Sequence, residues 1–549
     1  MNITRIYAGY LQLLRAREIS GILLKHLWQE YLDRSPRLRR LLKSKKKRQI
    51  PIKNTPTRLR ETIEDLGPTY IKFGQILADR PDLVTERFRN ELKKLQSKAI
   101  PLDDETAIQL IEKELGRPVE DVFKAFDKQA VASASIGQTY RAILQTGEEV
   151  IIKIQRPHIE NKIKLDLYLL SHLAKRAIRN YPELAVIDVV GLIDEFGVNI
   201  LKELNYFNEV NNINRFQDLF KDDPRVHIPK VYTEFTTRRL IVMEFIHGIA
   251  PDKIDHLKEA GLDPSIIAKN GADIILKMIL RHGFFHADPH PGNLFVMPGN
   301  VIAFIDFGMA GVLRPRHMTF LADFSLGFSQ RNSKSIARSL VKLCDIKFFD
   351  QMEEMEFEID DLLKGYSSIP FDKLDFSQIM QECINIIVRY ELKIPSNIFL
   401  LVKALATLQK FATQLQPDLS LGPIIIPYAK NLVLQKYSPK KFASDIYDTL
   451  GEYVSLIKEF PRDVREILYH LKQGKITHEI TTPKGDSIYK TLKRFTSRIS
   501  LVILLSGVLI SSATLMIYRP DSFFGTVSFT LASIITLYLI IKLLFSSKR

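Results

Sequence analysis

The pattern of hydrophobic and polar positions divides this chain of 549 residues into helical and extended stretches. Apolar residues recur every three or four positions in four long stretches, residues 1–35, 160–220, 262–282 and 315–475. That spacing places apolar side chains on one face of an α-helix, so these stretches are predicted to be helical. The chain is longer than one ordinary core can accommodate, and we expect roughly three to four domains.

Between the helical stretches the apolar positions alternate, which is typical of β-strands. Residues 131–157 predict a strand, a turn of small residues, a second strand, another turn and a buried third strand over 149–154. Residues 226–233 and 239–245 predict a further pair of strands. Strands and helices mixed in this way predict an α+β fold.

Two long apolar stretches lie at the C-terminal end of the chain. Residues 499–518 contain no charge and would form roughly 30 Å of helix, and residues 523–541 form a second such stretch after a turn. We therefore predict a transmembrane hairpin. Basic residues before the first stretch and after the second predict that both ends face the cytoplasm. The alternatives are two buried core helices and a hairpin that enters a single leaflet.

The composition narrows the class of protein. Hydrophobic residues make up 46% of the chain, which excludes wholesale disorder, and the net charge of +15 predicts an anionic partner. Basic residues cluster at 37–48 and again at 490–498, just before the first apolar stretch. Membrane lipid fits this placement, at about 1 kcal/mol per charge. No nucleic-acid recognition motif accompanies the clusters, so no nucleic-acid partner is expected.

The two cysteines, Cys344 and Cys383, form neither a metal-binding spacing nor a disulfide framework, which fits a reducing cytosolic compartment. The first thirty residues carry charges throughout and lack the apolar centre of a signal peptide.

The strongest chemical signal lies in residues 283–308. Asp288 is followed five positions later by Asn293, and an Asp-Phe-Gly sequence begins at Asp306. This is the layout of a kinase catalytic loop and its metal-binding aspartate. Asp288 would orient or deprotonate an attacking hydroxyl or water, and Asn293 and Asp306 would hold Mg²⁺ against nucleotide phosphates. The alternatives are a solvated loop rich in histidine and proline, or a metal site that uses His286 and His290.

A single lysine, Lys153, interrupts the buried strand over 149–154. A buried lysine needs a partner, and in a kinase this lysine pairs with the α- and β-phosphates and with a helix glutamate. The preceding turn would cover the phosphates, although alanine and serine replace the usual glycines. Its backbone amides and serine hydroxyls could meet phosphate oxygens. The turn consists of Ala132, Ser133, Ala134, Ser135, Ile136, Gly137 and Gln138.

Two acidic residues compete for Lys153. Glu203 and Glu209 are six positions apart, so on one α-helix they would project about 240° from each other and could not share a partner. We expect Glu209 to pair with Lys153 and Glu203 to face elsewhere, toward Lys72. The alternatives are two solvated acids and a surface lysine on an amphipathic helix. Gly74, near Lys72, predicts either close packing or approach to a ligand.

The strand over 239–245 leads to Gly248 in the way that the hinge between kinase lobes does. The backbone of Glu244 and Ile246 would then face the adenine of a nucleotide.

Taken together, these residues resemble the UbiB/ABC1/ADCK (AarF) family of atypical protein-kinase-like proteins, and its bacterial UbiB members in particular. The resemblance covers most of the chain. One departure is Asn205, where many relatives carry aspartate in a Glu-x-Asp motif. The matching motifs are Lys72-Phe-Gly-Gln75, the alanine-rich turn, Lys153, Glu203 with Glu209, the loop from His286 to Asn293, Asp306-Phe-Gly308 and the C-terminal hairpin.

The resemblance implies a two-lobed kinase-like fold with a helical N-terminal extension, a helical C-lobe and the membrane hairpin. The extension would carry Lys72 over the active site and block a protein substrate there. The segments expected are amphipathic helices with a basic linker over 1–55, the extension over 56–118, an N-lobe over 119–250, a C-lobe over 251–475, a second basic linker over 476–498 and two membrane helices over 499–545.

The resemblance further implies ATP and Mg²⁺ as cofactors, and an ATPase or small-molecule kinase that supports ubiquinone or other isoprenoid quinone biosynthesis. The expected location is the cytoplasmic (inner) membrane, with the catalytic domain in the cytoplasm. Membrane lipid, quinone precursors and quinone biosynthesis enzymes are the expected partners. Two alternatives remain, a protein kinase and a non-enzymatic nucleotide-binding scaffold.

Overall fold

The structure is a computed structural model, and it divides into two compact units, Met1–Ser444 and Asp445–Arg549. The residues that it describes are 3–34, 54–81, 83–95, 102–180, 189–346, 348–369, 376–436, 506–514, 517, 527, 529–531, 533 and 535.

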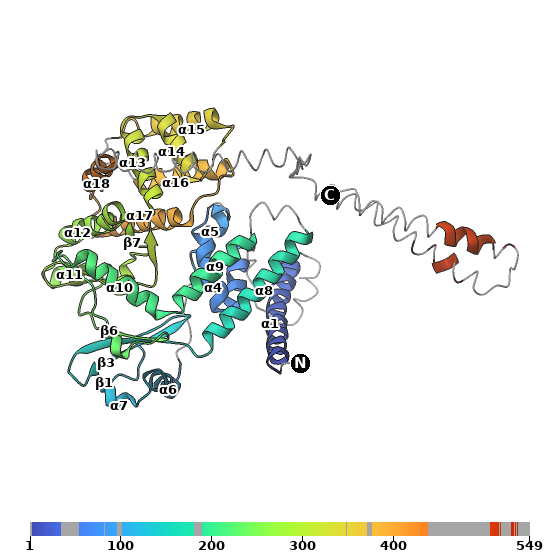
Figure 1. The fold of residues 1–549 in the computed structure, drawn as a ribbon, viewed down its shortest axis with the longest axis horizontal. Coiled ribbons are helices and arrows are strands. Elements are labelled where there is room, and N and C mark those ends of the chain that lie inside the picture. Colours follow the sequence, from blue (N-terminus) through green and yellow to red (C-terminus); the bar gives the residue numbers. More distant parts are fainter. Residues whose placement is uncertain are drawn as a thin grey trace, which may run out of the picture. The chain divides into compact units, whose positions relative to one another are not determined.

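A five-stranded antiparallel sheet forms one end of the first unit (Figure 1). Its path is β1 (Phe123–Phe126), β3 (Gly137–Leu144), β4 (Glu149–Gln155) and β6 (Leu240–Glu244), and β2 (Ala132–Ser133) pairs with β3. Val150, Ile152 and Ile154 of β4 are almost fully buried under one face of this sheet. Because successive side chains alternate between faces, Lys153 projects from the other face.

Helices pack beside the sheet and connect it to the rest of the unit. Helices α8 and α9 lie side by side, and α9 is followed closely by α10 (Figure 1). Their predicted helical character is confirmed. These helices and the short ones near the sheet are α6 (Asp104–Leu115), α7 (Val119–Val122), α8 (Ile159–Asn180), α9 (Val189–Glu203), α10 (Tyr206–Phe220) and η2 (Thr233–Phe235).

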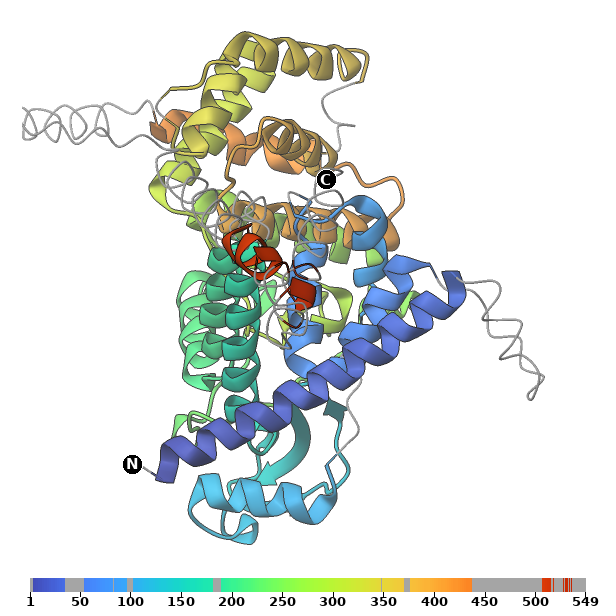
Figure 2. The ribbon, with the colours of Figure 1, turned by 90° about the vertical axis from the view of Figure 1, so that its right-hand side faces the viewer.

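The N-terminal helices form a separate layer against α8. They are α1 (Ile3–Arg34), α3 (Thr55–Leu66), α4 (Pro68–Ala78) and α5 (Glu86–Leu92). The long α1 crosses this layer diagonally (Figure 2). Arg15 of α1 lies 2.7 Å from the fully buried Asp166 of α8, and the Thr69 hydroxyl donates to the same carboxylate at 2.6 Å. Asp166 therefore joins α1, α4 and α8.

Local sequence explains where α4 begins and how closely it packs. Gly67 adopts a φ of 100° between α3 and α4, and Pro68 fills the first position of α4, where no backbone donor is needed. A Cβ on Gly74 would lie 2.5 Å from Leu95 Cδ1 and 3.3 Å from the side chain of Ile63. Gly74 is therefore required for close packing.

The remainder of the first unit is mainly helical and shares one large apolar core, in which both cysteines are free and buried. Its elements are β5 (Val226–His227), α11 (Ile254–Glu259), α12 (Pro264–Leu276), the π-helical turn η3 (Lys277–His282), β7 (Phe284–His286), η4 (Pro291–Asn293), β8 (Leu294–Met297), β9 (Val301–Phe304), β10 (Ala310–Val312), α13 (Pro315–Ser329), α14 (Ser333–Leu343), α15 (Met352–Gly365), α16 (Phe376–Arg389), α17 (Ser396–Leu415) and α18 (Gly422–Lys436).

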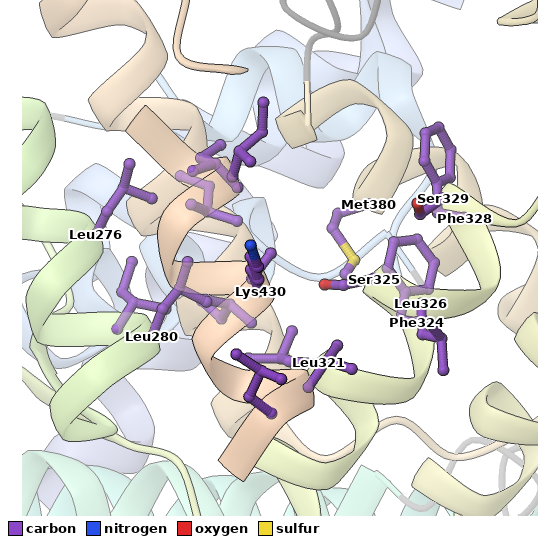
Figure 3. A pocket seen from close by; sticks show the side chains of 18 residues that line it. Leu276, Leu280, Leu321, Phe324, Ser325, Leu326, Phe328, Ser329, Met380 and Lys430 are labelled. Atoms are coloured by element: carbon purple, nitrogen blue, oxygen red, sulfur yellow. The ribbon is translucent and has the colours of Figure 1, made fainter. Parts of the chain in front are cut away.

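An apolar cavity of about 490 Å³ lies among these helices (Figure 3). Leucine, isoleucine and phenylalanine side chains from α12, η3, α13, α17 and α18 form most of its wall. Leu401 and Leu405 of α17 contribute to it, and Lys430 is the one charged residue that lines it.

The α+β fold class is confirmed, but one strand pair was predicted wrongly. Residues 226–233 do not form a ladder with 239–245. Val226 and His227 instead pair in parallel with β9, and only an isolated bridge joins Val231 to Met243. Pro229 has no backbone N–H, so it cannot continue a ladder between these points.

The predicted C-terminal hairpin falls mostly outside the described residues, as do the basic segments 37–48 and 476–498. Residues 506–514 of the second unit are helical. Among the described residues, one helix, α17, is long and apolar enough to cross a membrane by length and composition. Because nine of its side chains, including Phe399 and Phe411, are buried, we interpret α17 as a core helix.

Candidate active site

Lys153 and Glu209 form a buried ion pair at the centre of the site. Lys153 Nζ lies 2.6 Å from Glu209 Oε1 and 3.9 Å from Asp306 Oδ1. Burial alone would lower the pKa of Lys153, but the carboxylates of Glu209 and Asp306 outweigh it and hold the pKa above its usual value. The expected pairing with Glu209 is confirmed, and Lys153 remains a cation at neutral pH.

The second expected pairing is also confirmed, although its geometric basis was wrong. Lys72 Nζ donates to Glu203 Oε1 at 2.6 Å. Glu203 and Glu209 do not share one helix, because α9 ends at Glu203 and α10 begins at Tyr206. Asn205 caps α10 by accepting from the backbone N–H of Phe207 at 3.2 Å. The amide oxygen of asparagine can accept this capping hydrogen bond as a carboxylate oxygen would. Asparagine in place of the family's aspartate therefore leaves the start of α10 intact.

The turn between β2 and β3 lies along one wall of a cavity of about 690 Å³. The turn residues in that wall are Ala132, Ala134, Ile136, Gly137 and Gln138. A Cβ on Gly137 would meet the carbonyl of Ile154 at 2.7 Å and the hydroxyl of Tyr206 at 2.8 Å, so only glycine fits there.

The two serines of this turn do not behave as predicted. Neither Ser133 nor Ser135 is among the residues that line the cavity. The Ser133 hydroxyl accepts from Arg156 Nη2 at 2.8 Å, and Arg156 Nε donates to the carbonyl of Ala134 at 3.0 Å. Arg156 therefore anchors the turn at Ser133 and Ala134.

The opposite wall of the cavity contains the predicted hinge, from Met243 to Gly248. Glu244 and Ile246 both line it. The Glu244 carboxylate lies 3.0 Å from His227 Nε2 and accepts from the backbone N–H of Lys230 at 3.0 Å. These contacts hold its side chain toward β5.

His286 stabilises the catalytic loop through hydrogen bonds at both of its ring nitrogens. His286 Nδ1 accepts from the backbone N–H of Asp288 at 3.2 Å, so its Nε2 carries the proton and donates to the carbonyl of Asp306. Burial lowers the pKa of His286. Both ring nitrogens are therefore occupied by the protein. His290 uses its Nδ1 to accept from the backbone N–H of Gly292 at 3.1 Å. Both findings disfavour the alternative of a histidine metal site.

Asn293 and Asp306 both line the cavity, and a backbone hydrogen bond fixes their spacing. The backbone N–H of Ile305 donates to the carbonyl of Asn293 at 3.1 Å, which fixes the spacing of the two residues. Asn293 Nδ2 donates to the carbonyl of Asp288 at 3.0 Å, which leaves its amide oxygen as the atom available to a cation. The Lys153 ammonium holds the pKa of Asp306 below its usual value, so this carboxylate is ionised.

This donor set fits Mg²⁺ bound together with phosphates. Within the described residues, no group of three or more His, Cys, Asp and Glu side chains could hold a metal ion by itself. Mg²⁺ in nucleotide sites commonly takes one or two protein oxygen ligands and completes its shell with phosphate and water oxygens. Asn293 and Asp306 both line the cavity, and an amide oxygen and a carboxylate meet that requirement.

One residue of the site was missed by the sequence analysis. Lys403 of α17 lies 3.5 Å from Asp288 Oδ2 and 3.2 Å from Asp79 Oδ2, directly after α4. Burial alone would lower the pKa of Lys403, but the carboxylates of Asp79 and Asp288 raise it above its usual value. Its only signal in the sequence is a single charge within the apolar run Leu400-Leu-Val-Lys-Ala-Leu405.

Comparisons with known proteins match two domains in this chain. The ABC1 atypical kinase-like domain matches residues 94–340, and the UbiB helical domain matches residues 359–420. A Clostridium pasteurianum protein encoded in the 5′ region of hydrogenase 1 is 30% identical, over 90% of this chain and 94% of its own length. A "Probable protein kinase UbiB" of Pseudomonas fluorescens is 31% identical, over 74% of this chain and 77% of its own.

A third relative, the chloroplastic "Protein ACTIVITY OF BC1 COMPLEX KINASE 1" of Arabidopsis thaliana, is 34% identical over 69% of this chain and 56% of its own length. The two domains matched, and the relatives that align over most of their length, lead to one conclusion. The chain belongs to the ABC1/UbiB family of atypical kinase-like proteins.

Proposed function

We propose that this protein is a membrane-anchored, Mg²⁺-dependent ATPase that supports the biosynthesis of ubiquinone or another isoprenoid quinone. The observation that carries the proposal is the cavity lined by Lys153, Glu209, Asn293 and Asp306, in which Lys153 lies 2.6 Å from Glu209 and 3.9 Å from Asp306. These four groups are the ones that phosphoryl transfer from ATP requires.

Each side chain has a defined task in this proposal. Lys153, oriented by Glu209, would bind the α- and β-phosphates, and the hinge backbone at Glu244 and Ile246 would bind adenine. Asn293 and Asp306 would hold Mg²⁺, which neutralises phosphate charge when it is bound. Asp288 would orient the attacking oxygen and accept its proton.

Water or a small hydroxyl compound fits better than a protein as the phosphoryl acceptor. The C-terminal end of α4 contacts α17 beside the catalytic loop, because Lys403 bridges Asp79 and Asp288. The Arg80 guanidinium also lies 4.7 Å from the centre of the Phe399 ring of α17. The N-terminal helices thus contact α17 beside Asp288, which leaves less room there for a folded protein segment.

Two features support a membrane location. One is the predicted hairpin over 499–541, most of which lies outside the described residues. The other is α1, whose five most exposed large apolar side chains are between 57% and 69% exposed. At 100° per residue they fall within about 100° of one another around the helix, an arrangement typical of interfacial helices. They are Tyr10, Leu13, Leu24, Leu27 and Trp28.

The apolar cavity of Figure 3 supports a lipid-soluble ligand. Its wall of Leu, Ile and Phe side chains suits a hydrocarbon chain, and Lys430 suits a polar or acidic group at the end of that chain. An isoprenoid quinone precursor has both parts. Quinone biosynthesis enters the proposal through the family, and the cavity is the feature of this chain that agrees with it.

The test is phosphate release from Mg²⁺–ATP by the full-length protein in anionic liposomes. We expect release by the wild type, a loss of at least about tenfold in Asp306→Asn, and stimulation by a quinone-like phenol. Asp252→Asn, a substitution at an exposed aspartate that does not line the cavity, is the matched control.

The printed names of several relatives suggest a protein kinase instead. That function would be supported by transfer of the γ-phosphate to a protein in trans that is abolished by Asp288→Asn. Nucleotide binding without any phosphate release would favour a scaffold.

A further inference from the structure

Lys403 reaches the catalytic loop from outside the kinase-like domain. The ABC1 match ends at residue 340, and Lys403 lies in the UbiB helical domain. Its side chain is 26% exposed, and it lies between Asp288 at 3.5 Å and Asp79 at 3.2 Å. One ammonium therefore contacts the candidate proton acceptor and the residue that ends α4.

The catalytic loop itself lacks a cation. The usual kinase sequence places arginine between the histidine and the aspartate, whereas this chain has Ala287 there. Residues 286–293 contain neither lysine nor arginine. Lys403 is thus the positive charge that the described structure brings to Asp288, and it comes from a helix far along the chain.

We propose that Lys403 is a positioning residue of the active site, which orients the Asp288 carboxylate and couples that orientation to the N-terminal helices through Asp79. The proposal rests on the function proposed above. In the coupled arrangement, the ammonium holds Asp288 with one oxygen toward α17 and the other free toward the attacking group. If α4 moved so that Asp79 no longer contacted Lys403, Lys403 would contact Asp288 alone. The side chains of Lys403 and Asp288 would then change orientation.

A merely structural ion pair would behave differently. Asp79, Asp288 and Lys403 are each between 26% and 35% exposed, and ion pairs of such exposure contribute little to stability. A structural role therefore predicts a small change in thermal stability and no selective change in turnover. A positioning role predicts a loss of turnover while nucleotide binding remains, because Lys403 does not line the nucleotide cavity.

The experiment compares four single variants and one double variant of the full-length protein in anionic liposomes. Lys403→Met removes the ammonium and keeps the aliphatic stem, and Lys403→Arg keeps a charge. Lys410→Met, at an exposed lysine of the same helix two turns further on, is the matched control. Asp79→Asn removes the contact with α4 and is also combined with Lys403→Met. The readouts are kcat for Mg²⁺–ATP hydrolysis, the affinity for a fluorescent ATP analogue and the melting temperature.

We expect Lys403→Met to lose at least about tenfold in kcat, since small misplacements of a catalytic group cost up to about a hundredfold. Affinity for the analogue should stay within about threefold, and Lys403→Arg should recover most of the turnover. The double variant with Asp79→Asn should fall no further than Lys403→Met alone. Wild-type turnover in Lys403→Met would overturn the proposal, and fully additive losses would overturn the coupling to α4.

A second measurement separates this proposal from the proposed ATPase activity. Amide hydrogen exchange should accelerate together in residues 286–293 and 76–80 of Lys403→Met, and in neither segment of Lys410→Met. If the wild type releases no phosphate but Lys403→Met still shows this paired acceleration relative to it, the proposed ATPase activity is refuted and the coupling is retained. Unchanged exchange in both segments would refute the coupling whatever the activity.

Discussion

The ammonium of Lys72 lies 2.6 Å from the carboxylate of Glu203. Lys72 belongs to α4 and Glu203 to α9, and strands β1 to β4 come between these two helices in the sequence. Glu203 lines the nucleotide cavity, and Lys72 does not. The structure therefore places a neutralised carboxylate, rather than a free cation, at the part of the cavity where α4 approaches.

Removal of the Lys72 charge should weaken nucleotide binding through Glu203. In Lys72→Met, the unpaired carboxylate would repel the phosphates, at a cost of about 1 kcal/mol at several ångströms in a partly hydrated site. We expect the dissociation constant for Mg²⁺–ATP to rise roughly threefold to tenfold in a calorimetric titration. The double variant Lys72→Met with Glu203→Gln should bind almost as the wild type does. A double variant as weak as the single one would show that Lys72 itself holds the nucleotide.

Breaking the second ion pair should mainly affect folding. Glu209 is 6% exposed, so Lys153→Met would leave a buried carboxylate without its partner, which costs about 3 kcal/mol. For a unit of this size the melting temperature should fall by roughly 3 °C. Adding Glu209→Gln should restore most of this loss, because the amide carries no charge. Lys269→Met, at an exposed lysine of α12, should leave the melting temperature unchanged.

Much of the site could be predicted because its residues are close in sequence or sit in regular patterns. Asp288, Asn293 and Asp306 lie within twenty positions, and the alternation of β4 exposes Lys153 as the exception in a buried strand. The pairing of Glu209 with Lys153 was also predicted, although the helix break at Asn205 was not. Few other acidic residues were available to pair with Lys153. The prediction therefore named the correct partner although it placed both glutamates on one helix.

The features that were not predicted depend on tertiary packing, which the spacing of residues in the sequence does not encode. Lys403 meets Asp288 only because α17 packs against α12 and β10, more than a hundred positions after the loop. The Ser133 hydroxyl was assigned to phosphate because nothing in the sequence indicated that Arg156 would fold behind the turn. The strand over 226–233 was predicted from alternation, but Pro229 and the parallel pairing of β5 with β9 decided otherwise.

The contact between His227 and Glu244 should make stability depend on pH near neutrality. Hydrogen bonding to Glu244 raises the pKa of His227 above the usual 6.5. The protonated form is therefore favoured in the folded state, and its contribution is fully present below 6.5 and lost as the pH rises through the higher folded pKa. The difference in melting temperature between wild type and His227→Gln should be roughly 1 °C at about pH 5.5 and vanish near pH 9.

His256→Gln, at an exposed histidine of α11, is the control for this pH series. A His227→Gln difference that stayed constant or grew toward high pH would contradict the assignment, because a neutral imidazole would then be the stabilising form.

The apolar cavity makes a prediction about ligand binding that is separate from ATP turnover. Leu405 of α17 lines the cavity, so the larger indole in Leu405→Trp would fill part of its volume of about 490 Å³. The dissociation constant of a fluorescent prenylated phenol should rise at least about tenfold, because inserting extra volume into a packed site costs about 1–3 kcal/mol. Ala406→Trp, at the adjacent exposed position, should bind the probe as the wild type does.

This comparison is informative because α17 presents two different faces to the protein. Leu405 and Lys403 are two positions apart, so they point about 200° from each other, one into the cavity and the other toward Asp288. If Leu405→Trp bound the probe as tightly as the wild type, the prenyl chain would have to occupy another site. If it bound the probe weakly, the helix that carries the proposed positioning lysine would also be the wall against which a lipid-soluble ligand packs.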